Sequence, residues 1–352
     1  MFHFNLLVGA AFACAAAAPA LAQAPIAVPP PPTLNIYSAR HYQTDEALYD
    51  GFTRTTGIKI NRVDADDAGL LARLKTEGAS SPADVILLVD ASRLWRAEVD
   101  GLFQPVKSKT LESRIPATLR GKDEGQGSSW FGMSTRARVI VYNKAKVAPG
   151  DVDTYDELGD AKNKGRVCTR SGSHPYNLSL FGALYEHWGA QATQRWLTGM
   201  VDNMARSPKG GDTDQIMAVA SGECGVALTN TYYLARLMRS QKPQDREAVE
   251  KVGVVFPNQS GFGTHVNIAG AAVARNAKNL EAARQFLEYL ASDAAQQQFA
   301  DGNNEWPVVS TLQIDNPALI SLGKFKAETT PVSVIGMNQV AVQRMLDRVG
   351  YK

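Results

Sequence analysis

The chain has 352 residues, enough for two ordinary domains, and 44% of them are hydrophobic against 20% charged. This balance indicates a folded globular protein and excludes a disordered one. The 37 Lys and Arg residues nearly balance the 35 Asp and Glu residues, so the overall charge gives no reason to expect nucleic acid as a partner.

The N-terminus carries the long apolar stretch of the sequence. Residues 5–22 are alanine-rich and end in Ala20-Leu21-Ala22, which predicts a secretory signal peptide over residues 1–22 and a periplasmic location. An uncleaved membrane anchor and lipidation of Cys14 are the alternatives. Proline-rich residues 23–32 follow as a tether, because such a run cannot form a helix and stays extended.

The next segments alternate between strand and helix. Residues 34–38 predict a strand, and Thr44 is expected to cap a helix in which Leu48 and Phe52 share one face. Gly57 is expected to end that helix. A strand over 58–63, a helix over about 68–78 and a continuous apolar strand over 84–89 complete a βαβαβ order. That order predicts a parallel α/β sheet with ligands at the carboxyl ends of its strands.

The rest of the chain alternates between predicted strands and helices in the same way. Strands are expected over 139–142, 165–169, 225–229, 252–256 and 266–274, and helices over 177–189, 213–221, 234–239 and 280–292. Two α/β units in an exported chain predict a hinged, two-domain periplasmic-binding-protein fold (type II), with the ligand in the interdomain cleft. The expected first domain is 33–135 plus 267–308, and the second is 136–266 plus 309–352.

Motifs for familiar chemistry do not occur. The sequence has no Gly-x-Ser-x-Gly elbow, no His-Glu-x-x-His pair and no Walker loop. Gly261-Phe262-Gly263 is an incomplete dinucleotide fingerprint, and a flexible hinge explains it better. The protein is therefore expected not to be an enzyme, and a secreted enzyme using His41 as a base is the alternative.

Two cysteines remain after the leader, Cys168 and Cys224. In an oxidising compartment they could pair, but sequence alone does not give their distance. Metal ligation by these thiols is disfavoured, since no Cys-x-x-Cys or Cys/His spacing occurs.

Polar aromatic residues gather in three loops that follow predicted strands. These loops are Tyr37-Ser38-Ala39-Arg40-His41-Tyr42, Ser171-Gly172-Ser173-His174-Pro175-Tyr176-Asn177 and Asn230-Thr231-Tyr232-Tyr233. A single tyrosine in such a place is more often core packing than a ligand. Phenols titrate near ~10, so several phenolates at neutral pH need a strongly polarising, hard cation, and ferric iron is the candidate. His41 would add a nitrogen ligand, and Arg136 could offset excess phenolate charge.

With these loops the chain resembles the ferric-ion-binding proteins of bacterial and cyanobacterial iron ABC transporters, over essentially the whole mature chain. The motifs that carry the resemblance are the Arg40-His41-Tyr42 loop, the Tyr232-Tyr233 pair, Ser81-Pro82-Ala83-Asp84-Val85, Asp90-Ala91-Ser92-Arg93-Leu94-Trp95 and Arg136-Ala137-Arg138-Val139-Ile140-Val141-Tyr142-Asn143.

The resemblance implies a set of iron ligands. These are Tyr232, Tyr233, Tyr176 and His41 or Tyr42, or both. It also implies a bound anion such as carbonate near Ser171, Gly172, Asn230 and Arg136. Some relatives have a Glu ligand where this chain has Asp90, which is shorter and is expected only to cap a strand end. His174 is expected in a surface loop or as an outer contact of the site, and His187 and His265 as solvated residues without a role.

The function implied is capture of Fe(III) and its delivery to an inner-membrane ABC permease by a monomeric protein that binds no nucleic acid. The resemblance also favours the Cys168–Cys224 disulfide, since relatives carry cysteines there. The alternative on the same fold is a binding protein for an organic anion or a polyamine, in which Arg136 would hold a carboxylate.

Overall fold

The computed structural model describes residues 1–3, 32–40 and 42–352. Almost all of the predicted signal peptide and tether, Cys14, and the candidate ligand His41 therefore lie outside the described residues. Among the residues that are described, no helix combines the length and hydrophobicity that crossing a membrane requires.

The strands follow the predicted order, and the α/β class is confirmed. Their bounds are β1 Thr33–Ser38, β2 Lys59–Asp64, β3 Val85–Leu88, β4 Phe103–Gln104, β5 Phe131–Asn143, β6 Val167–Cys168, β7 Val226–Asn230, β8 Val252–Val255, β9 Val266–Ala274 and β10 Trp306–Pro307. β1 pairs in parallel with β2 and β3, as the βαβαβ order predicted, whereas β9 joins β3 and β5 in antiparallel fashion.

Helices connect and cover these strands. The α-helices are α1 Glu46–Thr56, α2 Asp67–Glu77, α3 Ala91–Val99, α4 Lys109–Arg114, α5 Pro175–Asp202, α6 Asp212–Ser221, α7 Thr231–Met238, α8 Pro243–Lys251, α9 Leu280–Leu290, α10 Asp293–Asn303, α11 Pro317–Ser321 and α12 Val332–Val349. Short 3-10 turns are η1 Gln43–Asp45, η2 Gly78–Ser80, η3 Ala117–Leu119, η4 Pro149–Asp151, η5 Asp156–Gly159 and η6 Ala161–Asn163.

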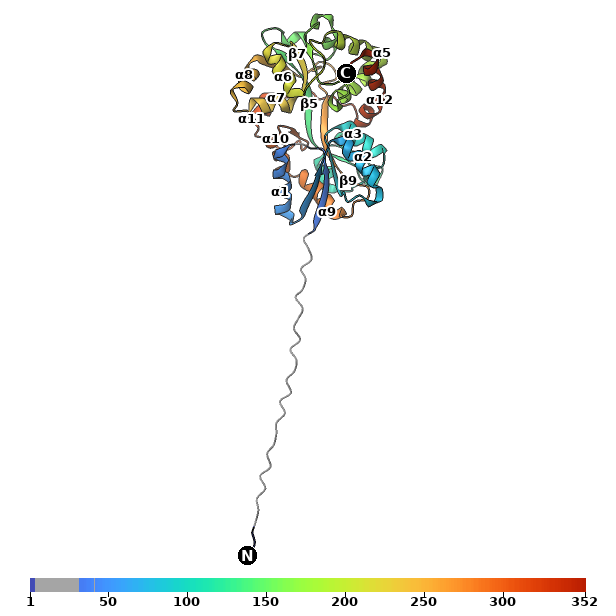
Figure 1. The fold of residues 1–352 in the computed structure, drawn as a ribbon, viewed down its shortest axis with the longest axis vertical. Helices are drawn as coiled ribbons and strands as arrows, with labels where there is room; N and C mark the ends of the chain where they lie inside the picture. Colours follow the sequence, from blue (N-terminus) through green and yellow to red (C-terminus); the bar gives the residue numbers. More distant parts are fainter. Residues whose placement is uncertain (4–31, 41) are drawn as a thin grey trace. The chain divides into compact units, whose positions relative to one another are not determined.

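β5 divides its pairing between two groups of strands. Its first part, to Ala137, pairs with β9, and its second part, from Arg138, pairs with β7. We call β1, β2, β3, β4, β9 and β10, with the first part of β5 and the helices that pack on them, the first lobe. β6, β7 and β8, with the second part of β5 and their helices, form the second lobe. In Figure 1 β5 and β9 run between these lobes.

Each lobe has a hydrophobic core on both faces of its sheet, because successive side chains of a strand point to opposite faces. In β3, Val85 and Leu87 enter one core with α1 and α9, while Ile86 and Leu88 enter another with α2 and α3. The strands of the second lobe alternate in the same way between two further cores.

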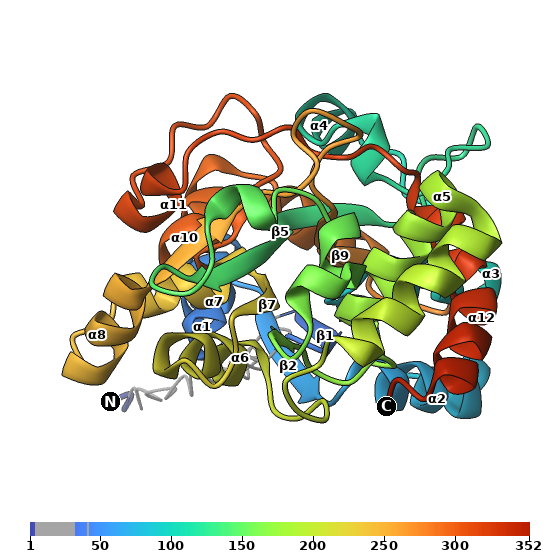
Figure 2. The same cartoon turned by 90° about the horizontal axis from the view of Figure 1, so that it is seen from above.

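The C-terminal helix closes the second lobe. Figure 2 shows α12 lying alongside α5, and Val342, Met345 and Leu346 of α12 are buried in the core that α5 covers. Its N-terminal half also packs against α3 of the first lobe.

Some local predictions were wrong. Thr44 does not cap α1: it lies within η1, and Asp45 occupies the N-cap position without a side-chain cap bond. The end of α1 is confirmed, since Gly57 has a left-handed φ of 73° that favours glycine. β5 begins well before residue 139, and α5 continues past a kink at Gly189, whose φ is 74°.

Cys168 and Cys224 form a disulfide, with their Cα atoms 5.9 Å apart. Cys168 ends β6 and Cys224 lies two residues before the start of β7, and the two strands are parallel neighbours. The bond therefore links the end of β6 to the residues just before β7, at the edge of the second lobe.

Candidate functional site

Three strand ends place four tyrosines in one region between the lobes. Tyr42 follows β1, Tyr176 lies in the first turn of α5 after β6, and Tyr232 and Tyr233 lie in the first turn of α7 directly after β7. The sequence placed the Tyr pair in a turn before a helix starting at residue 234. The helix in fact starts at Thr231, so both tyrosines are helical.

Tyr232 is the centre of this cluster. Its hydroxyl lies 3.2 Å from the hydroxyl of Tyr176. Its ring centroid lies 4.2 Å from that of Tyr233 and 5.8 Å from that of Tyr42, which meets it edge-on. Phenol groups from both lobes therefore converge, and we call these four residues the tyrosine cluster.

Burial holds the phenols of Tyr42, Tyr176 and Tyr232 in the neutral form when no cation is bound. Burial raises the pKa of Tyr176 to about 12, although nearby Arg136 opposes the increase. Burial and neighbouring acidic or phenolic groups raise the pKa of Tyr42 and of Tyr232 well above the ordinary value. Ionisation at neutral pH thus requires a positive charge that the cluster itself does not supply.

Arg136 is a buried cation beside the cluster. Its guanidinium lies 5.3 Å from the Tyr176 ring centroid, and Nη2 donates to the carbonyl oxygen of Val89. Burial opposes its charge, but Tyr176, Glu305 and Tyr232 raise the pKa of Arg136. Its Nε and Nη1 atoms are buried without a protein partner in the described residues, so two donors remain for an anion.

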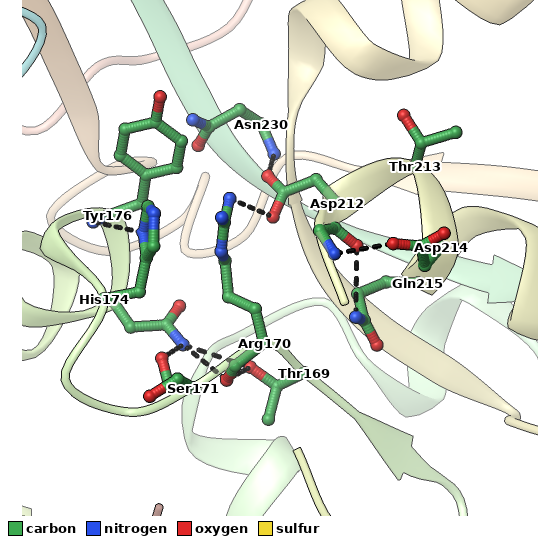
Figure 3. A network of polar contacts seen from close by, with 12 residues as sticks. Thr169, Arg170, Ser171, His174, Tyr176, Asp212, Thr213, Asp214, Gln215 and Asn230 are labelled. Carbon is green, nitrogen blue, oxygen red and sulfur yellow. Dashed lines mark hydrogen bonds and ion pairs between the residues drawn. The ribbon is translucent and has the colours of Figure 1, made fainter. Parts of the chain in front are cut away.

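A charged network that the sequence did not reveal fixes the start of α7. Asp212 Oδ2 accepts from Arg138 Nη1 at 2.5 Å and from the backbone N–H of Asn230 at 2.7 Å. Arg138 also donates to the side-chain oxygen of Asn230. Figure 3 shows Asn230 above Asp212. Because Asn230 directly precedes the helix, this network positions the Tyr pair. The Nδ2 of Asn230 is buried and has no hydrogen-bond partner among the described residues.

Arg170 joins this network to the cluster. In Figure 3 its guanidinium lies between Tyr176 and Asp212; Nη1 donates to Asp212 Oδ1 at 3.2 Å, and the guanidinium carbon lies 5.1 Å from the Tyr176 ring centroid. His174 caps α5, because its Nδ1 accepts from the backbone N–H of Tyr176. Burial and the cations Arg170 and Arg138 lower the pKa of His174 to about 3. The imidazole is therefore neutral beside the cluster, as an outer contact.

Ser171 and Gly172 have other contacts. The hydroxyl of Ser171 lies 3.0 Å from that of Ser173. The N–H of Gly172 donates to the carbonyl oxygen of Lys352 at 2.9 Å, and its Cα packs against the Tyr351 ring. No contact observed in the described residues joins either one to the cluster, and their role with an anion stays a prediction.

Tyr42 is held from the first lobe. Arg40 pairs with Asp45 at 2.6 Å and with Glu305 at 3.2 Å, and its guanidinium lies 4.9 Å from the Tyr42 ring centroid. The Tyr42 hydroxyl donates to Glu305 Oε1 at 3.4 Å. Sequence reasoning missed Glu305, because it lies more than 260 positions from Arg40 and Tyr42 and belongs to no motif.

Asp90 has a structural role, but it caps a helix rather than a strand end. It caps α3 by accepting from the Ser92 N–H, and it also accepts from Asn267 at 2.7 Å and from the Ser179 hydroxyl at 2.9 Å. Both carboxylate oxygens are therefore used, and Ser179 comes from the second lobe. The contact ties the lobes together.

The prediction that His265 is solvated was wrong. His265 is buried, with Nδ1 3.0 Å from Glu328 Oε1, and His187 stacks on Phe262 with Nε2 3.2 Å from Glu328 Oε2. Glu328 lies on the segment after α11, and its carboxylate contacts both rings; His265 is buried, whereas His187 is exposed. The pair belongs to the packing of the hinge region, away from the cluster.

The described residues contain no group of three or more His, Cys, Asp or Glu that could hold a metal ion. The cluster instead offers phenol oxygens, which as phenolates are hard donors suited to a highly charged cation rather than to zinc or copper. Beside it, a cavity of about 570 Å³ has walls from both lobes, including Tyr42 and Tyr176. A cation held here would bridge the lobes.

Comparison with known proteins gives consistent matches along nearly the whole chain. The family model "Bacterial extracellular solute-binding protein" matches residues 47–326. The chain is 48% identical to Iron uptake protein A1 of Synechocystis sp. over 319 residues, covering 91% of this chain and 87% of that protein.

Solved structures agree with this. A Trichodesmium protein whose structure is described as a complex with iron and citrate ligands is 50% identical, with a TM-score of 0.85 over 91% of this chain and 100% of that chain. The ferric binding protein from Campylobacter jejuni is 38% identical, with a TM-score of 0.85 over 91% and 100% of the respective chains.

Proposed function

Because the chain belongs to the family of bacterial extracellular solute-binding proteins, and within it groups with iron uptake and ferric binding proteins, we propose that it captures Fe(III) in the periplasm. It acts as a binding protein rather than an enzyme, and it delivers the ion to an inner-membrane ABC permease.

The observation that carries this proposal is the tyrosine cluster. The hydroxyls of Tyr176 and Tyr232 are 3.2 Å apart, and the ring of Tyr42 reaches Tyr232 from the other lobe. Several phenolates around one point suit a hard trivalent cation. We propose Tyr176, Tyr232 and Tyr233 as ligands, with Tyr42 or His41, or both, completing the set.

Arg136 and Asn230 are proposed to hold an anion, such as carbonate, that fills part of the coordination sphere. Support comes from the buried donors Arg136 Nε and Nη1 and Asn230 Nδ2, which have no protein partner in the described residues. An anion beside them would satisfy these donors.

The domain limits predicted from sequence, 33–135 plus 267–308 and 136–266 plus 309–352, are proposed as the moving parts. The change of β5 from pairing with β9 to pairing with β7 at Ala137 and Arg138 supports a hinge there. Small-angle scattering should show compaction when iron is added to the iron-free protein. An unchanged radius would count against hinged capture.

The function itself is tested by metal analysis and a visible spectrum of the protein loaded with ferric citrate and then desalted. We expect one iron per chain and a coloured phenolate-to-iron band. A protein that retains iron without colour would refute phenolate ligation, and one that retains no iron would refute the function.

A further inference from the structure

A second cavity, larger than the one beside the tyrosine cluster, lies elsewhere in the described residues. It has a volume of about 1210 Å³ and lies between α3, the segment 117–130 and the segment 325–335. Thr135 of β5 and Val266 and Ile268 of β9 line it where these strands join the lobes. None of the four tyrosines lines this cavity, so iron capture leaves it unexplained.

Aromatic rings form its walls. Trp95, Trp130, Trp306 and Phe325 all line the cavity. Trp130 is fixed by a hydrogen bond from its indole N–H to Glu98 at 3.2 Å, and the rings of Trp306 and Phe325 pack with centroids 5.3 Å apart. The walls are therefore preformed and largely apolar, as in pockets for small organic ligands.

One cation at the cavity has no counter-charge. The guanidinium of Arg120 makes no hydrogen bond or ion pair to any described residue, and its Nε is buried without a partner. The carboxylates that line the cavity are already engaged. Glu98 accepts from Ser129 and Trp130.

The two other carboxylates are engaged as well. Glu124 pairs with Lys122 at 2.9 Å, and Glu328 pairs with His265. Arg120 is therefore the group at this cavity that lacks an anion, and leaving its buried donor unsatisfied costs free energy that a ligand could recover.

We propose that this cavity is a second ligand site, for an organic anion with an aromatic or alkyl body. The carboxylate or sulfonate pairs with Arg120, and the body packs against Trp95, Trp130 and Trp306. A charge-assisted bond to guanidinium fixes the orientation, and the apolar contact supplies most of the affinity.

A pair of fluorescent probes separates the two contributions. The anionic probe 8-anilinonaphthalene-1-sulfonate and the neutral probe N-phenyl-1-naphthylamine share nearly the same rings, and only the first has a sulfonate. We expect the anion to bind at one site per chain, with energy transfer from tryptophan. Arg120→Gln should weaken the anion about tenfold or more, as loss of a charged hydrogen bond predicts, and leave the neutral probe unchanged.

Arg54→Gln is the matched control. Arg54 is exposed on α1, outside the cavity, and its variant should bind both probes as the unmodified protein does. The anion should also bind when ferric iron is bound, which makes the result independent of the proposed iron site. The proposal would be overturned if Arg120→Gln bound the anionic probe as tightly as the unmodified protein does, or if iron displaced that probe. It would also be overturned by an unmodified protein that does not prefer the anion to the neutral probe.

Discussion

Asp212 is the residue on which the position of the Tyr pair most depends. It is fully buried and accepts hydrogen bonds from Arg138, Arg170 and the backbone N–H of Asn230. Asp212→Asn keeps the size of the side chain but removes its charge and leaves two guanidinium groups without an anionic partner. Removing one partner from a buried ion pair costs about 3–5 kcal/mol, so we expect a loss of stability in that range.

The loss should be measured by urea unfolding followed by circular dichroism, at neutral pH and without iron. Asp214→Asn is the matched control, since Asp214 lies two positions later in the same helix, is exposed, and caps it by accepting from the Gly211 N–H at 2.7 Å. Its loss should cost about 1 kcal/mol or less. Asp212→Asn should also weaken iron binding more than the control does, because Asp212 holds Asn230, the residue directly before α7 and its Tyr pair. Equal stability of the two variants would refute the role given to the network.

Three other outcomes follow from the structure. Replacing Cys168 and Cys224 together by serine should lower the free energy of unfolding by about 2–5 kcal/mol, which would be seen as a lower melting temperature. A reductant should no longer affect the melting temperature of this variant. An unchanged melting temperature would contradict the prediction. Burial would raise the pKa of Glu328, but hydrogen bonds from His265, Thr330 and His187 outweigh it and lower this pKa to about 2. The charged carboxylate therefore stabilises the fold at pH values above the unfolded-state pKa of Glu328, and this stabilisation is lost as the pH falls towards about 2. Glu328→Gln should therefore cost on the order of 3 kcal/mol at neutral pH, with a smaller difference below about pH 4, and a pH-independent difference in unfolding experiments would argue against it. Finally, the raised pKa values of Tyr42, Tyr176 and Tyr232 mean that iron must displace phenolic protons, so affinity measured against citrate should fall from about pH 7.5 to about pH 5.5, and a flat profile would exclude phenolate ligands.

The alternation of strands and helices could be predicted from sequence because it depends on local patterns. Val85 to Leu88 form a continuous apolar run that both faces of a sheet bury, and Gly57 marks a helix end. Boundaries were less accurate where tertiary contacts decide them. α7 starts at Thr231 rather than after the Tyr pair, because the network around Asn230 fixes its first turn.

Part of the candidate site could be predicted from the sequence. Tyrosines after strand ends could be read from the sequence, since strand ends of an α/β sheet face a common edge. The residues that position these tyrosines could not be predicted in this way. Arg138 and Asp212 are 74 positions apart, and Glu305 reaches Arg40 across 265 positions, so no local pattern connects them. His265 was expected in solvent because its burial depends on Glu328, which is also distant in sequence.

The central claim is that phenolates of the tyrosine cluster hold the iron. The most direct test is the visible spectrum and iron affinity of Tyr176→Phe, Tyr232→Phe and Tyr233→Phe beside the control Tyr142→Phe, which lies within β5 away from the cluster. Phenylalanine keeps the ring and removes the ligand oxygen. Each of the three cluster variants should weaken or shift the iron band and bind iron less tightly, while the control keeps both. If all three cluster variants retain the colour and affinity of the unmodified protein, the iron is bound elsewhere and the account is wrong.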